Sequence, residues 1–211
     1  MIRVGIELNH VKRNINKQIL KYYQKDIDPS LDLDDIDEKD DVFTYAKFNS
    51  NRDKNEFIYI DYPYEIFGCA KTMTKELPVE INNWLNDLTN YEDDTVEIYF
   101  YSLKEESLTI QSSFFFLSKI GTRVRKIIFP RDLNDLTKDT EVIITANEEV
   151  VNFLSDKDNI YKILINNNTN SNCKEKVNAN YDSLSEMIKD EKLLNTLHEF
   201  VTNKSEVKDE N

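Results

Sequence analysis

The chain has 211 residues and a formal net charge of −13, and 39% of its residues are hydrophobic. This length allows one domain, or one domain with a small insertion, and the apolar content excludes a disordered chain. The negative charge repels polyphosphates and anionic lipids, so neither nucleic acid nor a membrane is an expected partner. Two cysteines are too few for a disulfide framework, and no apolar run could span a bilayer or form a signal region, so we expect a protein that is not secreted.

The first residues predict a strand, a turn and a helix. Apolar residues alternate along residues 2–8, which indicates a buried strand, and residues 14–24 place their apolar side chains on one helical face. No frame of the Asp-rich segment 26–41 supplies both the Gly at the sixth position and the Glu at the twelfth that an EF-hand calcium loop needs. We therefore interpret this segment as a solvated acidic loop or the start of a helix.

Aromatic segments follow the acidic loop. Residues 43–48 and 57–62 predict two strands joined by the turn-rich segment 49–55, which would form a hairpin in an inserted cap. The aromatic segment 62–68 is expected to pack at the cap junction, with a protein contact as the alternative.

The second half of the chain alternates strands with helices. Pro78 favours the first turn of a helix, Gly121 is expected to close another, and Ser183 with Glu186 predicts a capping box for a last amphipathic helix. Apolar patterns predict strands at residues 96–101, 124–129, 141–145 and 161–165, and helices at residues 105–120 and 148–154. This alternation indicates an α/β fold, a Rossmann-like three-layer sandwich with a mostly parallel five-stranded sheet and a small cap insertion.

The first strand ends at Glu7, and Asn9 follows two residues later. This layout resembles the first motif of the haloacid-dehalogenase-like superfamily, in which one Asp is the nucleophile and a second Asp, two residues on, is the general acid and base. The layout is closest to the deoxyribonucleotidase-like branch. The resemblance implies a core domain of residues 1–25 and 92–202, a cap insertion of residues 26–91 and a polar tail of residues 203–211. An unrelated Rossmann-like domain whose first strand ends Glu-Leu-Asn is the alternative.

The resemblance also assigns later motif positions. Ser102, after the predicted strand 96–101, matches the phosphate-binding hydroxyl, Thr145 falls where the family has metal-binding acids, and the Lys position falls near Ser113. A second alignment makes Thr145 the phosphate-binding hydroxyl and Asn166 and Asn167 the metal pair. The metal carboxylates are missing under either alignment.

The residue types at these positions do not suit phosphoryl transfer. The additional methylene of Glu7 displaces its carboxylate from the distance of about 3–3.5 Å at which a nucleophile attacks. Asn9 neither gives up nor takes a proton near neutral pH, and Thr145 with Ala146 offers little to Mg²⁺. We therefore expect no catalytic, cofactor-binding or metal-binding residue, and Mg²⁺ only if the chain is an enzyme.

Other kinds of site find little support. The histidines are His10 and His198, and three glycines are too few for a nucleophile elbow or a phosphate loop. His10 occupies a position where the family often has Gly, so it is expected to fill the entrance of the former site. The cations Lys119, Arg123, Arg125 and Lys126 are interpreted as a solvated or salt-bridged edge, with a binding site as the alternative.

The leading hypothesis is a catalytically inactive protein that acts as a structural or interaction subunit of a multi-protein assembly, with protein subunits as its partners. Degenerate motifs of this sort also occur in proteins of tailed bacteriophages, so the resemblance implies a location in the cytoplasm or in a virion. The alternative is a divergent magnesium-dependent phosphatase or 5′-nucleotidase in which Glu7 acts and Ser102 holds the phosphate. A third hypothesis is a module that binds a phosphorylated ligand at Ser102 without hydrolysing it.

Overall fold

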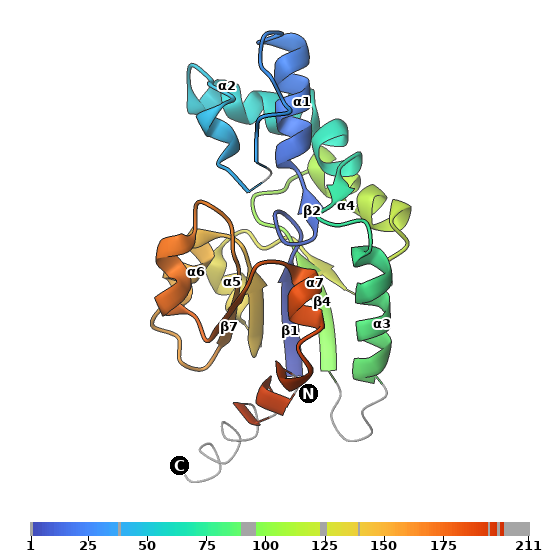
Figure 1. The fold of residues 1–211 in the computed structure, drawn as a ribbon, viewed down its shortest axis with the longest axis vertical. Coiled ribbons are helices and arrows are strands. Elements are labelled where there is room, and N and C mark those ends of the chain that lie inside the picture. The colour runs from blue at the N-terminus through green and yellow to red at the C-terminus, as the bar shows by residue number, and fades with distance from the viewer. Residues whose placement is uncertain are drawn as a thin grey trace.

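A computed structural model describes residues 2–37, 39–89, 96–122, 126–138, 140–193, 195–197 and 199–200. Figure 1 shows a sheet flanked by helices, with a helical cap beyond the end of the sheet toward which the first strand runs. The chain leaves that end of β1, enters the cap through β2 and returns to the sheet afterwards.

Within the described residues, the sheet has six strands in the order β5-β4-β1-β6-β7-β8, and every neighbouring pair is parallel. Its strands are β1 (Ile2–Glu7), β4 (Val96–Tyr101), β5 (Ile127–Ile128), β6 (Val142–Thr145), β7 (Tyr161–Ile165) and β8 (Ala179–Tyr181). The predicted α/β, Rossmann-like, mostly parallel sandwich is confirmed, with one strand more than the five expected. The additional strand β8 has three residues, Ala-Asn-Tyr, which are too short and too polar to give a strand pattern.

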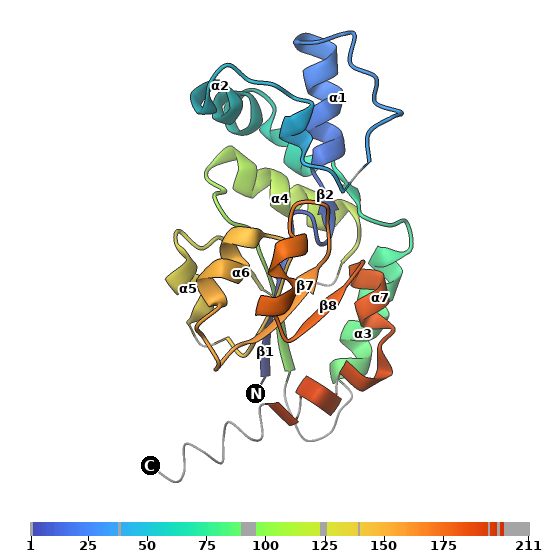
Figure 2. The same cartoon turned by 60° about the vertical axis from the view of Figure 1, so that its left-hand side comes forward.

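Helices cover both faces of the sheet, and each face has its own hydrophobic cluster. On one face, α3 (Leu77–Thr89) and α7 (Leu184–Ile188) pack against the side chains of Val4 and Ile6. On the other face, α5 (Leu133–Thr137) and α6 (Glu148–Leu154) pack against Tyr99 and Ile143. Figure 2 shows these two helix layers on opposite sides of the strands.

The cap is a helical unit between the two short strands β2 (Arg13–Asn14) and β3 (Lys71–Thr72), which pair in antiparallel orientation. It contains α1 (Asn16–Asp26), the 3-10 turn η1 (Val42–Thr44), α2 (Asn51–Glu56) and the π-helical segments η2 (Phe57–Asp61) and η3 (Tyr64–Gly68). A hydrophobic cluster separate from that of the sheet holds these elements together. Packing thus groups α1 with the cap, whereas α3 packs on the sheet.

The predicted cap hairpin is wrong. Residues 57–62 form η2 and its C-terminal cap, and residues 43–48 contain η1 rather than a strand. Their aromatic rings gather around Tyr23 of α1, with ring centroids of Tyr23 and Phe48 5.2 Å apart and those of Phe48 and Phe57 5.3 Å apart. The β-propensity of aromatic residues is overridden here because a small helical cluster buries them equally well.

The other element predictions differ mainly at their ends. Strands 96–101 and 161–165 and helix 148–154 are confirmed to the residue, Pro78 lies in the first turn of α3, and Gly121 has a φ of 65°. The predicted helix 105–120 begins only at Leu108, as α4 (Leu108–Lys119), and the last helix is interrupted after Ile188. Of the predicted strand 124–129, residues 124 and 125 lie outside the described residues, as do His198 and the tail 203–211.

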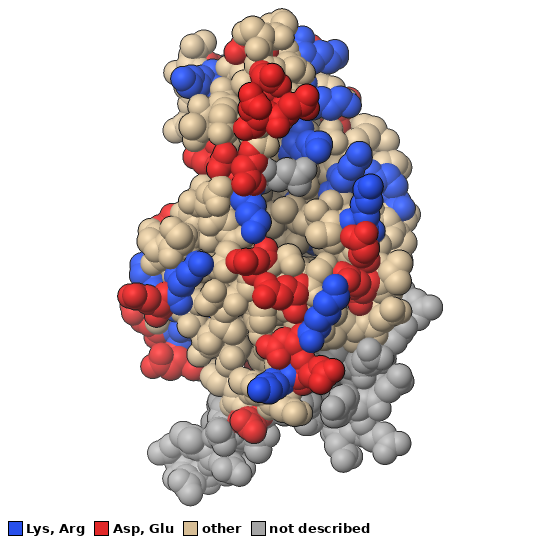
Figure 3. All heavy atoms as spheres, in the orientation of Figure 1, with Lys and Arg blue, Asp and Glu red and all other residues tan. Residues whose placement is uncertain are grey.

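Acidic side chains gather on the cap and around the face of the sheet domain seen in Figure 3, with fewer basic ones between them, consistent with the net charge of −13. No helix in the described part of the chain is both long enough and apolar enough to cross a membrane.

Candidate functional site

The predicted motif positions meet at the carboxyl edge of the sheet, below the cap. β1 lies between β4 and β6, and Glu7 pairs in register with Tyr101, directly before Ser102. Thr145 Oγ1 donates to Glu7 Oε2 at 2.6 Å, and Asn9 Nδ2 donates to Ser102 Oγ at 3.1 Å. The structure therefore brings the four predicted residues to one edge of the sheet as two hydrogen-bonded pairs, Glu7 with Thr145 and Asn9 with Ser102.

The turn after β1 is tightly folded. The backbone N–H groups of Lys12 and Arg13 both donate to Leu8 O, at 3.0 and 2.7 Å, and His10 has a φ of 63°. This turn reverses the chain so that Arg13, at the start of β2, comes back beside Asn9. Lys12 is buried as well: its Nζ donates to Thr122 Oγ1 at 2.6 Å, and burial lowers its pKa to about 7.

Glu7 is directed into the protein. Its side chain is buried, and Oε2 accepts hydrogen bonds from Thr145 Oγ1 at 2.6 Å and from the Ala146 N–H at 3.0 Å. Burial raises the pKa of Glu7 to about 7, although these hydrogen bonds act in the opposite direction. The carboxyl group is therefore held by β6 rather than presented to a ligand.

Asn9 is engaged by a buried arginine. Arg13 Nε and Nη2 donate to Asn9 Oδ1 at 3.0 and 2.6 Å, and Nη2 also pairs with Glu105 Oε1 at 2.5 Å. The side chains of Arg13 and Glu105 are both 0% exposed. Arg13 Nη1 donates to Ser113 Oγ at 2.5 Å and to the Phe67 carbonyl of the cap at 3.3 Å.

Glu105 completes this cluster. Its Oε1 accepts from Ser102 Oγ and its Oε2 accepts from Ser113 Oγ, both at 2.5 Å. We call Asn9, Arg13, Ser102, Glu105 and Ser113 the Arg13 network. It ties together the turn after β1, the end of β4, α4 and the cap.

Sequence reasoning missed both charged members of the Arg13 network. The sequence does contain a sign that Arg13 is important, since it stands between a buried strand and an amphipathic helix, and a charge buried there needs an opposite charge beside it. Nothing in the spacing connects it to Glu105, which lies 92 residues away. Ser113 stands at the position where the resemblance places a Lys, and its hydroxyl accepts from the Arg13 guanidinium. The positive charge at this place therefore comes from Arg13 and not from α4.

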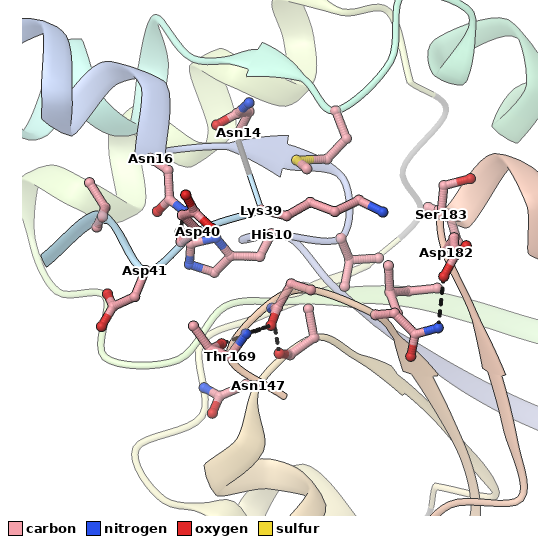
Figure 4. Close-up of a pocket in the computed structure, with 18 of the residues that line it drawn as sticks. His10, Asn14, Asn16, Lys39, Asp40, Asp41, Asn147, Thr169, Asp182 and Ser183 are labelled. Carbon is pink, nitrogen blue, oxygen red and sulfur yellow. Dashed lines mark hydrogen bonds between the residues drawn. The ribbon is translucent and has the colours of Figure 1, made fainter. Parts of the chain in front are cut away.

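A cavity of about 300 Å³ lies beside the Arg13 network, between the cap and the carboxyl ends of β6, β7 and β8. Figure 4 shows His10, Lys39, Asp40 and Asp182 around it. His10 was expected at the entrance of a former site and does line this cavity, and burial lowers its pKa to about 4. The lining includes none of Glu7, Asn9, Ser102 and Thr145.

The second motif alignment is not supported by the sheet order. β6 lies between β1 and β7, so Asn166 and Asn167, which follow β7, are a full strand farther from Glu7 than Thr145 is. Asn167 Oδ1 instead accepts from the backbone N–H groups of Thr169 and Asn170, at 2.9 and 3.0 Å, so it stabilises its own loop.

The predicted cationic edge is engaged within the protein where it is described. Lys119 Nζ donates to the carbonyls of Gly68 and Ala70, each at 3.0 Å, and Lys126 Nζ lies 3.5 Å from Glu97 Oε1. Arg123 and Arg125 lie outside the described residues.

Comparisons with known proteins do not assign a family. No protein-family model matches the chain, and no curated protein matches it. Across the residues that the structure describes, no group of three or more His, Cys, Asp or Glu side chains is arranged to hold a metal ion. The carboxyl edge of the sheet contains the Arg13 network, in which the side chains bond one another, and beside it a cavity lined by charged, polar and apolar residues.

Proposed function

We propose that this chain is a catalytically inactive protein with a dehalogenase-like scaffold, which acts as a structural or interaction subunit of a multi-protein assembly such as a phage virion. The topology supports the scaffold. The strand that ends in Glu7 is flanked by β4, which leads into Ser102, and by β6, which ends in Thr145, and the cap is inserted directly after the first motif. This is the arrangement of motifs that the resemblance implies.

The engagement of Glu7 is the observation that carries the proposed loss of catalysis. A nucleophile must approach within about 3–3.5 Å of the atom it attacks. Glu7 is buried, bonded to Thr145 and Ala146, and absent from the lining of the adjacent cavity. Its carboxyl group has no route to a phosphorus atom in this arrangement.

The Arg13 network supports the same proposal. A phosphoryl group needs cationic or N–H donors that are free to contact its oxygens. Nε, Nη1 and Nη2 of Arg13 all donate to protein acceptors, and the Ser102 hydroxyl donates to Glu105. Ser102 is also fully buried, which argues against the hypothesis that it binds a phosphorylated ligand.

The competing hypothesis remains a divergent magnesium-dependent phosphatase or 5′-nucleotidase. The position of Glu7, at the carboxyl end of the central strand, favours it. It would require Glu7 to leave Thr145 and Ala146, and the buried pair of Arg13 and Glu105 to open.

An activity assay separates the two hypotheses. Purified wild-type protein and Glu7→Gln would be incubated with nucleoside monophosphates and an aryl phosphate, with and without Mg²⁺. We expect no magnesium-dependent turnover by either protein. Turnover by the wild type that Glu7→Gln abolishes would contradict the proposal and identify an enzyme.

The interaction role has its own test. Affinity capture followed by light scattering would measure whether the full chain enters a stoichiometric complex. We expect such a complex with a protein subunit. A monodisperse monomer that also turns over phosphate esters would contradict the proposed role.

A further inference from the structure

The cavity beside the Arg13 network is negatively charged. Asp40, Asp41, Glu148 and Asp182 line it, against one lysine, Lys39. The hydrogen-bond partners of Asp40 and Asp182 are uncharged: Asp40 accepts from Tyr45 and Asn168, and Asp182 accepts from Asn166. A cavity lined in this way attracts cations and repels phosphate and carboxylate ligands.

Two asparagines that line the cavity each have an amide oxygen without a hydrogen-bond partner among the described residues. These are Asn16 Oδ1 and Asn166 Oδ1, and both atoms are buried. The orientation of each amide is fixed by its nitrogen, because Asn16 Nδ2 donates to the Asp40 carbonyl and Asn166 Nδ2 donates to Asp182. The cavity thus has a surplus of acceptor groups in and behind its wall, and ammonium and guanidinium groups, which consist only of donors, match such a lining.

The cavity also has apolar walls. Val11, Met73 and Leu77 line one part of it, and Ile165 and Leu184 line another. Its volume of about 300 Å³ is at the lower end of the range for small-ligand cavities. Apolar walls beside carboxylates suit an aliphatic chain that ends in a charged group, since its methylenes pack against the walls while the charged group stays among polar groups.

We propose that this cavity binds an aliphatic cation, an ammonium or guanidinium group on a short methylene chain. The cation could come from a free diamine or from a Lys or Arg side chain of a partner protein, and the chemistry recognised is the same. This site goes beyond the proposed function and does not depend on it, because amine binding is measured separately from phosphate turnover.

Lys39 supports this assignment from within the molecule. Figure 4 shows its side chain extending across the cavity from the cap toward Asp182 and Ser183. Its charge contributes to lowering the pKa of Asp182, although the hydrogen bond from Asn166 is the larger cause. Lys39 therefore occupies part of the space in which an external cation would bind and competes with it.

Calorimetric titration of the full chain tests the proposal. The probes are cadaverine, N-acetyl-lysine methylamide and, as a neutral isostere, pentanediol, all at one ionic strength. We expect saturable binding of at least one amine and none of the diol. Binding of cadaverine alone would assign a free diamine, and binding of the lysine derivative would assign a partner side chain. Absence of amine binding, or equal binding of the diol, would overturn the proposal.

Charge variants make the test specific to the cavity. Asp182→Asn and Asp40→Asn should each weaken amine binding by about fivefold, as expected for the loss of one partly exposed charge contact. Asp35→Asn is the matched control, because Asp35 lies in the same acidic loop as Asp40 but is exposed and outside the cavity lining. If Asp35→Asn weakened amine binding as much, the amines would be attracted by the net charge of the protein rather than by the cavity, and the proposed site would be overturned.

Lys39→Gln should change the amine affinity in the opposite direction from the aspartate variants. Removal of the competing cation should tighten amine binding by about threefold to tenfold. A gain in affinity cannot result from misfolding, so this variant keeps the test valid even if an aspartate variant unfolds. Unchanged or weaker binding by Lys39→Gln would contradict the assignment.

Discussion

The two sides of the carboxyl edge of this sheet both contain carboxylates and amides, but on one side these groups bond one another and on the other side they surround a cavity. On the side of β4, the Arg13 network pairs a buried guanidinium with a carboxylate and satisfies both with neutral side chains. On the side of β6 to β8, amides and carboxylates surround a cavity and two amide oxygens have no partner. Asn9 and Ser102 belong to the Arg13 network, and Glu7 is bonded to Thr145 at the end of β6, so all four motif positions are engaged within the protein and none lines the cavity.

Closure has an energetic basis. A buried ion pair repays the cost of desolvation only when its remaining donors and acceptors are also bonded. Arg13 meets this condition through Asn9, Ser113 and the Phe67 carbonyl of the cap. We infer that the Arg13 network fixes the cap on the sheet and that opening it for catalysis would be costly.

The largest expected effect comes from breaking the network. Glu105→Gln leaves the Arg13 charge buried without a counter-charge, so it should lower the free energy of unfolding by about 3–5 kcal/mol. Denaturant unfolding measures this loss. The control is Lys104→Gln, which removes an exposed pair with Glu149, whose side chains are 67% and 57% exposed, and should change stability little. Equal losses in the two variants would show that the network is not closed.

The next effect concerns Glu7 and His10, whose pKa shifts oppose each other. The folded-state pKa of Glu7 is raised to about 7, so its protonated form contributes stability below pH 4.5 that is lost as the pH rises toward 7. The pKa of His10 is lowered to about 4, so its contribution is present above pH 6.5 and is lost as the pH falls toward 4. In the wild type these two contributions largely cancel between pH 4.5 and 6.5.

Single variants should separate the two contributions. Glu7→Gln should make stability rise with pH between 4.5 and 6.5, by up to about 3 kcal/mol, because only His10 remains. His10→Asn, which tolerates the positive φ of this position, should make stability fall over the same range. Unfolding curves measured at several pH values give both slopes. Parallel profiles for the two variants would contradict the burial of Glu7.

The smallest expected effect is the loss of stability on removing the N-cap of α7, which lies at the edge of the cavity. Ser183 caps α7 by accepting the Glu186 N–H at 3.1 Å, so Ser183→Ala should cost about 1 kcal/mol of stability. Ser118→Ala, at an exposed position inside α4, is the control and should be neutral or slightly stabilising. Thermal melts of both variants measure the difference. A loss in Ser118→Ala as large as that in Ser183→Ala would remove the capping explanation.

The sequence predicted the sheet far better than the cap. Strands such as residues 161–165 are short, mainly apolar segments between turns, so the local sequence is enough to predict them. Residues 57–62 were predicted as a strand because aromatic residues favour strands, but residues 57–61 are helical, and Phe57 packs against Tyr23 and Phe48. Such contacts are formed by distant residues and leave no local pattern.

The candidate site was predictable only in part. Glu7, Asn9, Ser102 and Thr145 were assigned through the family resemblance, which places its motifs at or just beyond the ends of predicted strands. Arg13, which bonds Asn9, and its counter-charge Glu105 are 92 residues apart in the sequence and come together only through the fold. The cavity was not predicted, since its lining comes from the cap, the turn after β1, the segment after β3 and the loops that follow β6, β7 and β8.

One measurement tests the contrast between the closed and open sides most directly. Thermal melts of the wild-type protein would be recorded with cadaverine and with orthophosphate plus Mg²⁺, at equal ionic strength. We predict a rise in Tm with cadaverine and no change with orthophosphate and Mg²⁺, because the cavity accepts cations and the motif positions are closed. A rise with orthophosphate and Mg²⁺, and none with the amine, would contradict the account.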